Sequence, residues 1–180
     1  HFLLPLLYAL VFMFVVIKMK FCDLSNLSRI ILLALFAVKL LAAFVVCIVY
    51  TKYYSSSDFY TYFNDSKIIV HKILENGSGE GMQSWNSHFD PVIFNSSRIM
   101  IILNAILFLF SFGNFYVHIV FFCSFSFIGA IGLFRGFNKH FPQKTIVLVL
   151  GIFLVPSILF WTSAALKESV VMGIVGLLIY

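Results

Sequence analysis

The stretch IILLALFAVKLLAAFVVCIVY, residues 30–50, decides the fold class of this chain, and Lys39 is its single charged residue. A helix of about 20 predominantly apolar residues is long enough to cross the hydrocarbon layer of a bilayer. The apolar residues surround this helix on all sides instead of forming one stripe, as in a helix that faces lipid. The stretch therefore predicts a membrane-spanning helix.

The rest of the chain has the same character. Hydrophobic residues make up 62% and charged residues 11% of its 180 residues, whereas a soluble domain is about 45–50% apolar and about 25% charged. This composition excludes a soluble enzyme, and the high hydrophobicity excludes a disordered chain. We predict an all-α, polytopic transmembrane helical bundle, with spans at residues 2–17, 30–50, 99–112, 116–134, 145–160 and 169–180.

We interpret residues 1–180 as a single membrane domain that is part of a longer protein. The chain begins at His1 instead of Met, and its last apolar run reaches Tyr180 before attaining the length of a span.

The long polar loop 51–98 holds most of the acidic residues. Its residues 58–75 predict an amphipathic helix at the membrane interface, nearly parallel to the surface, with its aromatic face toward the lipid. A loop of this length is too long for an ordinary connection and is often functional. The broad apolar face of the predicted helix consists of Phe59, Phe63, Ile69, Ile73 and Leu74.

Two shorter connections are basic. If the spans alternate strictly, these connections fall on opposite sides of the membrane. Each side then carries three basic residues, so the positive-inside rule does not decide the orientation. A re-entrant segment would break this tie, and the short run 99–112 is the candidate. We place the loop 51–98 outside the cytoplasm because its net charge is not positive. The basic residues are Lys18, Lys20 and Arg29 after the first run, and Arg135, Lys139 and Lys144 after the fourth.

Asp58 is the candidate catalytic residue. It follows the second span within YYSSSDFYTYFND, residues 53–65, where aromatic residues flank it on both sides. A carboxylate at the membrane surface can act as a general base on a sugar hydroxyl, and the rings of Tyr60 and of Trp85 can hold the sugar. The alternative is that Asp58 only caps the helix that follows.

Three basic residues are candidates for binding a lipid phosphate. Lys39 lies near the middle of a span, where a charge is costly and indicates function unless the side chain snorkels to the surface. Lys167 opens a helix, where the helix dipole disfavours a cation; the alternative is an interfacial pair with Glu168. Arg98 lies at a helix end, where anchoring is the alternative.

The sequence indicates no resident cofactor. His118 is the single histidine deep in a span, so a haem with two histidine ligands is not expected, and no cysteine pair has the spacing of a zinc or iron–sulfur site. We predict no metal ligands, although a divalent metal is compatible with Asp58. The net charge of +5 comes from loop residues, so we expect no nucleic-acid partner.

Two stretches carry a resemblance to known proteins. KLLAAFVVCIVYTKYYSSSDFYTYFND, residues 39–65, is similar in outline to the first external loop of GT-C membrane glycosyltransferases, which carries an acidic residue. PSILFWTSAALKES, residues 156–169, resembles the element P-S-x-x-F-W-x-S-G-x-x-K-E of largely uncharacterised bacterial envelope proteins related to polysaccharide polymerases.

The resemblance implies a transferase or polymerase that acts on a polyprenyl-phosphate-linked sugar in the bacterial inner membrane, during synthesis of cell-envelope polysaccharide. Asp58 would be the base or a metal-facing acid, and the basic residues would contact the phosphate. We also expect Asp58 and Lys167 to line one cavity, which requires a re-entrant segment or an end of the fifth helix at Pro156. The alternative function is a non-catalytic membrane subunit that binds lipid and partner helices.

Overall fold

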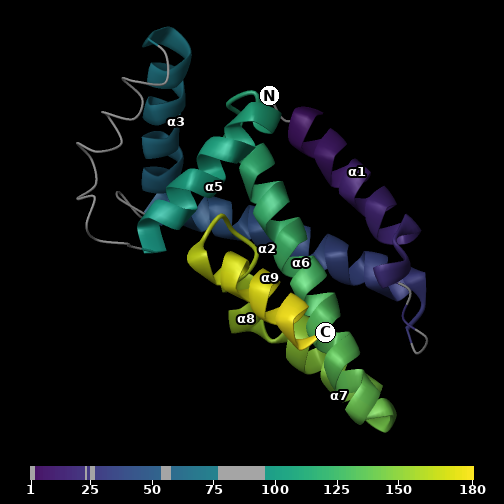
Figure 1. Ribbon diagram of the computed structural model, residues 1–180. Helices are drawn as coiled ribbons and strands as arrows, with labels where there is room; N and C mark the ends of the chain where they lie inside the picture. Colours follow the sequence, from purple (N-terminus) through teal and green to yellow (C-terminus); the bar gives the residue numbers. More distant parts are fainter. Residues whose placement is uncertain (1–2, 23, 25–26, 54–57, 77–95) are drawn as a thin grey trace.

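The computed structural model describes residues 3–22, 24, 27–53, 58–76 and 96–180. Within these ranges every regular element is helical (Figure 1), which confirms the all-α class. Two described helices are long and apolar enough to cross a membrane, α2 (Arg29–Tyr53) and α6 (Phe115–His140). The other predicted spans form shorter helices. These are α1 (Leu3–Lys18), α5 (Ser96–Ser111), α7 (Thr145–Val149), α8 (Pro156–Trp161) and α9 (Lys167–Ile179).

The helix α6 is the centre of the fold and the most buried of the long helices. Tyr8 of α1 packs on Phe121 of α6 with ring centroids 5.3 Å apart, and Phe36 of α2 packs on Phe127 with centroids 4.9 Å apart. The helix α1 runs along α6 in the same direction, whereas α2 crosses it in the opposite direction (Figure 1). Both neighbours bury apolar side chains against α6.

Both basic connections lie at the same end of the molecule, so the expectation of opposite sides is wrong. Arg135, near the end of α6, donates to the carbonyl oxygen of Phe21 at 2.8 Å, and its guanidinium lies 5.5 Å from the centroid of that ring. We call this the basic end. The opposite end, where α2 meets α3 (Asp58–Asn76), we call the Asp58 end. The two basic connections share one end because α2 ends and α6 begins at the Asp58 end, so the chain between them returns to the end from which it started.

Cysteine labelling can test this arrangement in a membrane. In a background in which Cys22, Cys47 and Cys123 are replaced by alanine, we expect cysteines at Lys20 and Lys139 to react with an impermeant maleimide from one side. A cysteine at Asn64 of α3 should react from the other side. All three positions are exposed. Reaction of the Lys20 and Lys139 positions from opposite sides would contradict the fold.

The predicted amphipathic helix is present as α3, but its buried face differs from the predicted one. Ile73 and Leu74 are 43% and 72% exposed, because the buried face follows a spacing of three and four residues that leaves them outside it. The helix α3 lies beside α5 (Figure 1), and Phe63 of its buried face packs on Phe115 of α6 with ring centroids 5.1 Å apart. That α3 lies along the membrane surface stays a prediction. The buried face consists of Phe59, Tyr62, Phe63, Ser66, Ile69 and Val70.

The candidate re-entrant run 99–112 forms α5, which stays at the Asp58 end. Met100 and Ile101 at its start pack in one cluster with Phe59. In its last turn, the carbonyl oxygen of Phe110 accepts a hydrogen bond from the Tyr8 hydroxyl at 2.6 Å.

Inside the hairpin of α5 and α6, the buried ring of His118 bridges two side chains. Its Nδ1 is 2.8 Å from Asn104 Oδ1, and its Nε2 is 2.7 Å from Ser111 Oγ.

The predicted fifth span is broken before Pro156. Its first part is α7 followed by a π-helical turn, Leu150–Leu154, and Val155 is extended with φ −61° and ψ 120°. A residue that precedes proline avoids the helical region, because the proline ring clashes with it. The chain then continues as α8.

Together, α7, α8 and α9 form a hairpin that starts and ends at the basic end (Figure 1). Phe153 packs on Phe134 and on Phe127, so the first arm runs back along α6. The second arm, α9, returns beside α6 until the ring of Tyr180 lies 4.9 Å from the guanidinium of Arg135. The tip of the hairpin therefore reaches the middle of α6.

Candidate functional site

The hairpin tip, residues 162–166, is non-helical and almost wholly buried. Ser126, near the middle of α6, donates to the carbonyl oxygen of Thr162 at 2.6 Å. At the depth of a bilayer interior, irregular backbone is tolerated only where protein surrounds it. The tip meets this condition because it packs among side chains of α2, α3, α5 and α6.

Lys39 donates to the hydroxyl oxygen of Thr162 at 2.6 Å, although the two residues are 123 positions apart in the chain. The Thr162 hydroxyl in turn donates to the carbonyl oxygen of Ile158 at 2.7 Å. Lys39 is 4% exposed, so the snorkelling alternative is wrong. No acidic side chain in the described ranges pairs with it, and an ammonium group has three donors. A buried ionisable residue in an apolar helix of this length is therefore a candidate functional residue.

Asp58 and Lys167 meet through Tyr62, which the sequence analysis did not single out. The Tyr62 hydroxyl donates to Asp58 Oδ2 at 3.2 Å. The Lys167 ammonium lies 5.5 Å from the centroid of the Tyr62 ring and interacts electrostatically with the carboxylates of Asp58 and Glu168. Asp58 is exposed and Lys167 is partly exposed, so both groups are accessible.

A cavity of about 400 Å³ lies on the other side of the α9 start. Glu168 lines it together with Trp161, and Thr162 connects it to Lys39. Successive residues of a helix point about 100° apart, so Lys167 faces Tyr62 while Glu168 faces the cavity. The expectation that Asp58 and Lys167 share one cavity stays a prediction. The lining residues are Ser157, Ile158, Trp161, Thr162 and Glu168.

The remaining predicted site residues lie apart from this pair. The Tyr60 ring stacks on Phe115 with centroids 4.7 Å apart, so the protein itself covers one of its faces. Arg98 lies in the first turn of α5 and is 9% exposed, two residues before Met100 of the cluster around the tip. Trp85 lies outside the described residues. In the described ranges, no group of three histidine, cysteine, aspartate or glutamate side chains could hold a metal ion.

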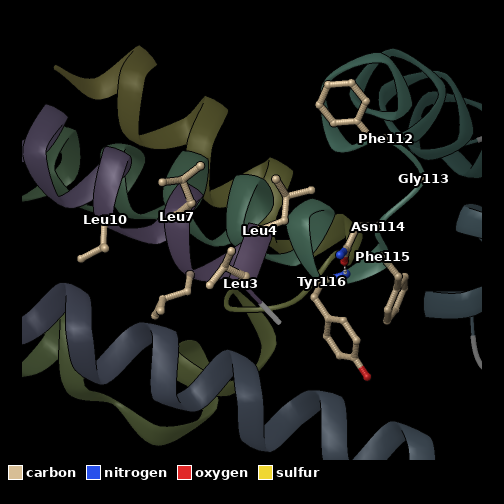
Figure 2. Close-up of a pocket in the computed structure, with 10 residues that line it drawn as sticks. Leu3, Leu4, Leu7, Leu10, Phe112, Gly113, Asn114, Phe115 and Tyr116 are labelled. Carbon is tan, nitrogen blue, oxygen red and sulfur yellow. Dashed lines mark hydrogen bonds between the residues drawn. The ribbon is translucent and has the colours of Figure 1, made fainter. Parts of the chain in front are cut away.

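Two larger cavities are apolar and lie along α1. One, of about 740 Å³, separates α1 from the turn between α5 and α6, and the other, of about 490 Å³, lies between α1, α2 and α6. Figure 2 shows the first, with Leu3, Leu4 and Leu7 of α1 facing the segment from Phe112 to Tyr116. These walls suit hydrocarbon chains.

Cross-linking can test whether Asp58 and Lys167 are adjacent, independently of any activity. In the cysteine-free background, we expect a short bis-maleimide to join cysteines at positions 58 and 167 in high yield, because Tyr62 contacts both native residues. A cysteine at Lys72 paired with position 167 is the control, since Lys72 lies about 20 Å further along α3. Equal yields for the two pairs would contradict the site.

Comparisons with protein-family models, with curated proteins and with solved structures find no match to this chain. Function is therefore inferred from the chemistry of the described residues. These residues place an exposed carboxylate beside one cation, and a second, buried cation on α2 donates a hydrogen bond to the adjoining hairpin tip.

Proposed function

We propose that this protein is a polytopic membrane glycosyltransferase or polysaccharide polymerase that acts on polyprenyl-phosphate-linked sugars in the bacterial inner membrane, for cell-envelope polysaccharide synthesis. The observation that carries the proposal is the meeting of Asp58 and Lys167 through Tyr62, beside the buried tip that holds Lys39. A carboxylate and two cations are the groups that such a transfer needs.

In the proposed reaction, Asp58 removes the proton from the attacking sugar hydroxyl. The hydroxyl oxygen forms a bond to the anomeric carbon of the lipid-linked sugar, and the bond from that carbon to the phosphate oxygen breaks. The leaving polyprenyl phosphate group takes the electron pair. Lys167 beside Tyr62 and Lys39 at Thr162 stabilise the negative charge, since fixed cations around a leaving phosphate lower the barrier.

The distribution of charge supports the proposed orientation. All six basic residues of the two short connections lie at the basic end, and the positive-inside rule assigns that end to the cytoplasm. The Asp58 end then faces the outer side of the membrane, where polyprenyl-linked sugars are joined in this proposal. The apolar cavities beside α1 provide surface for the lipid chain.

A non-catalytic membrane subunit is the second candidate, and one observation favours it. Leu3, Leu7 and Leu10 of α1 are 83%, 57% and 56% exposed and line the largest of the described cavities (Figure 2). A helix of a partner protein could pack in that cavity. In this alternative, Asp58 and Lys167 only hold α3 against α9.

A turnover assay separates the two candidates. The full-length protein, purified into lipid nanodiscs, is incubated with lipid-linked sugars extracted from its own host and carrying a radioactive label. We expect the label to move from the lipid-soluble fraction into a water-soluble or longer glycan, in proportion to the amount of protein. No transfer under conditions in which host membranes support it would overturn the enzymatic function and favour the subunit.

A further inference from the structure

The cavity between α8 and the start of α9 has walls of mixed chemistry. Trp161 presents an indole that is 45% exposed, Glu168 presents a carboxylate, and Ser157 presents a hydroxyl group. The cavity is an open depression of about 400 Å³ at the protein surface, with space for a small ligand. An aromatic surface with a few convergent polar groups is typical of a pocket that orients a small polar molecule.

These groups match the surface of a sugar ring. A pyranose has a face of C–H groups that can lie on the indole of Trp161, and hydroxyl groups at its edge that can donate to the carboxylate of Glu168. The exposed hydroxyl of Ser157 can both donate and accept a hydrogen bond. A wholly apolar ligand would displace water from the exposed Glu168 carboxylate without replacing its hydrogen bonds, so the cavity disfavours such a ligand.

The cavity also has a cation on each side. Thr162 forms part of its wall and accepts a hydrogen bond from Lys39, which reaches it from the buried side of α2. Lys167 precedes Glu168 on α9. A sugar in the cavity would therefore hold its anomeric phosphate near cations that are already in place. The attacking hydroxyl would approach from Asp58, on the opposite side of Lys167.

We infer that this cavity is the subsite for the sugar ring of the lipid-linked donor, in which Trp161 stacks on the ring and Glu168 accepts hydrogen bonds from its hydroxyl groups. This inference rests on the proposed function and names the part of the chain that selects the sugar. Neither Trp161 nor Glu168 takes part in breaking bonds. Both residues position the substrate.

The test observes the indole directly. The full-length protein is labelled with 5-fluorotryptophan in nanodiscs, and the ¹⁹F resonance of Trp161 is assigned by its loss in the variant Trp161→Phe. The probes are the methyl glycosides of glucose, galactose and N-acetylglucosamine, at concentrations up to about 100 mM, since a single ring should bind with a Kd in the millimolar range. We expect at least one probe to shift the Trp161 resonance in a saturable way.

Glu168→Gln keeps the shape of the side chain and removes its charge. We expect this variant to weaken binding of the active probe about tenfold or more, because a hydrogen bond to a charged group contributes about 1.5–3 kcal/mol. The resonance of Trp85 serves as an internal control. A saturable shift at Trp85 with none at Trp161 would overturn the subsite, because the sugar would then bind at the long loop that contains Trp85.

The outcomes separate this inference from the proposed function. Turnover of lipid-linked sugar with no shift of Trp161 for any probe overturns the subsite and leaves the function intact. A saturable, Glu168-dependent shift without turnover supports the subsite and overturns the enzymatic function. A shift that Glu168→Gln does not weaken overturns the assigned role of Glu168.

Discussion

Replacing Asp58 by asparagine is expected to lower glycan formation about 100-fold or more, because a positioned general base contributes about 10²–10⁴-fold to a rate. Asparagine keeps the size of the side chain and can still accept the hydrogen bond from Tyr62, so α3 should remain in place. Lys167→Ala is expected to lower product formation about 10- to 100-fold, the effect of losing one charge-assisted contact to the phosphate. Product is measured with the labelled lipid-linked sugars, and protein level by immunoblotting.

Two variants on α3 serve as matched controls. Asp65→Asn makes the same change of charge on the same helix, and Lys72→Ala removes a lysine that is exposed to solvent. Both should keep most of the activity and the normal protein level. If Asp58→Asn is as active as Asp65→Asn, then Asp58 only stabilises the start of α3 and the catalytic role is wrong.

Introducing a side chain at Gly176 is expected to be the most destabilising single-atom change in the second half of the chain. The helices α6 and α9 touch backbone to backbone, and a methyl group at Gly176 would overlap the carbonyl oxygen of Gly129. Neither helix can yield locally, because Gly132 meets the backbone of Gly176 in the same way. We expect Gly176→Ala to lower the free energy of unfolding by about 3 kcal/mol, the upper range for overpacking.

Gly151→Ala is the control for this prediction. Nothing lies within 4 Å of a methyl group at that position, so the same substitution should change stability by less than about 0.5 kcal/mol. Stability is measured as the apparent melting temperature in detergent, by fluorescence-detected size-exclusion chromatography. Similar melting temperatures for the two variants would mean that α9 does not dock on α6 as described.

The helices of this fold could be predicted well from the sequence, because each apolar run is compact and bounded by polar residues. The break before Pro156 was also foreseeable, since proline constrains the residue before it. The relative directions of the helices were not foreseeable. Strict alternation assumes that every run crosses the membrane, whereas α5 stays at one end of the molecule and the α7–α9 hairpin turns back beside the middle of α6.

The site was only partly foreseeable, for a related reason. Lys39, Asp58 and Lys167 stood out because each is a charge in an unusual place. Tyr62 and Thr162, which connect them, look like ordinary members of an aromatic helix and of a short loop. A spacing of four residues from Asp58 is the one local signal for Tyr62. No local signal exists for Thr162, because its partner Lys39 is 123 residues away.

The α7–α9 hairpin has a consequence for how the protein is made. In the proposed membrane topology, the hairpin begins and ends at the basic end, so none of its loops has to be carried across the bilayer during synthesis. Lys167 and Glu168 follow the hairpin tip at the middle of α6, and α9 then packs backbone to backbone on the glycines of α6. Asp58 precedes Lys167 in the chain, so the contact of both residues with Tyr62 can form only after the α7–α9 hairpin has been synthesised.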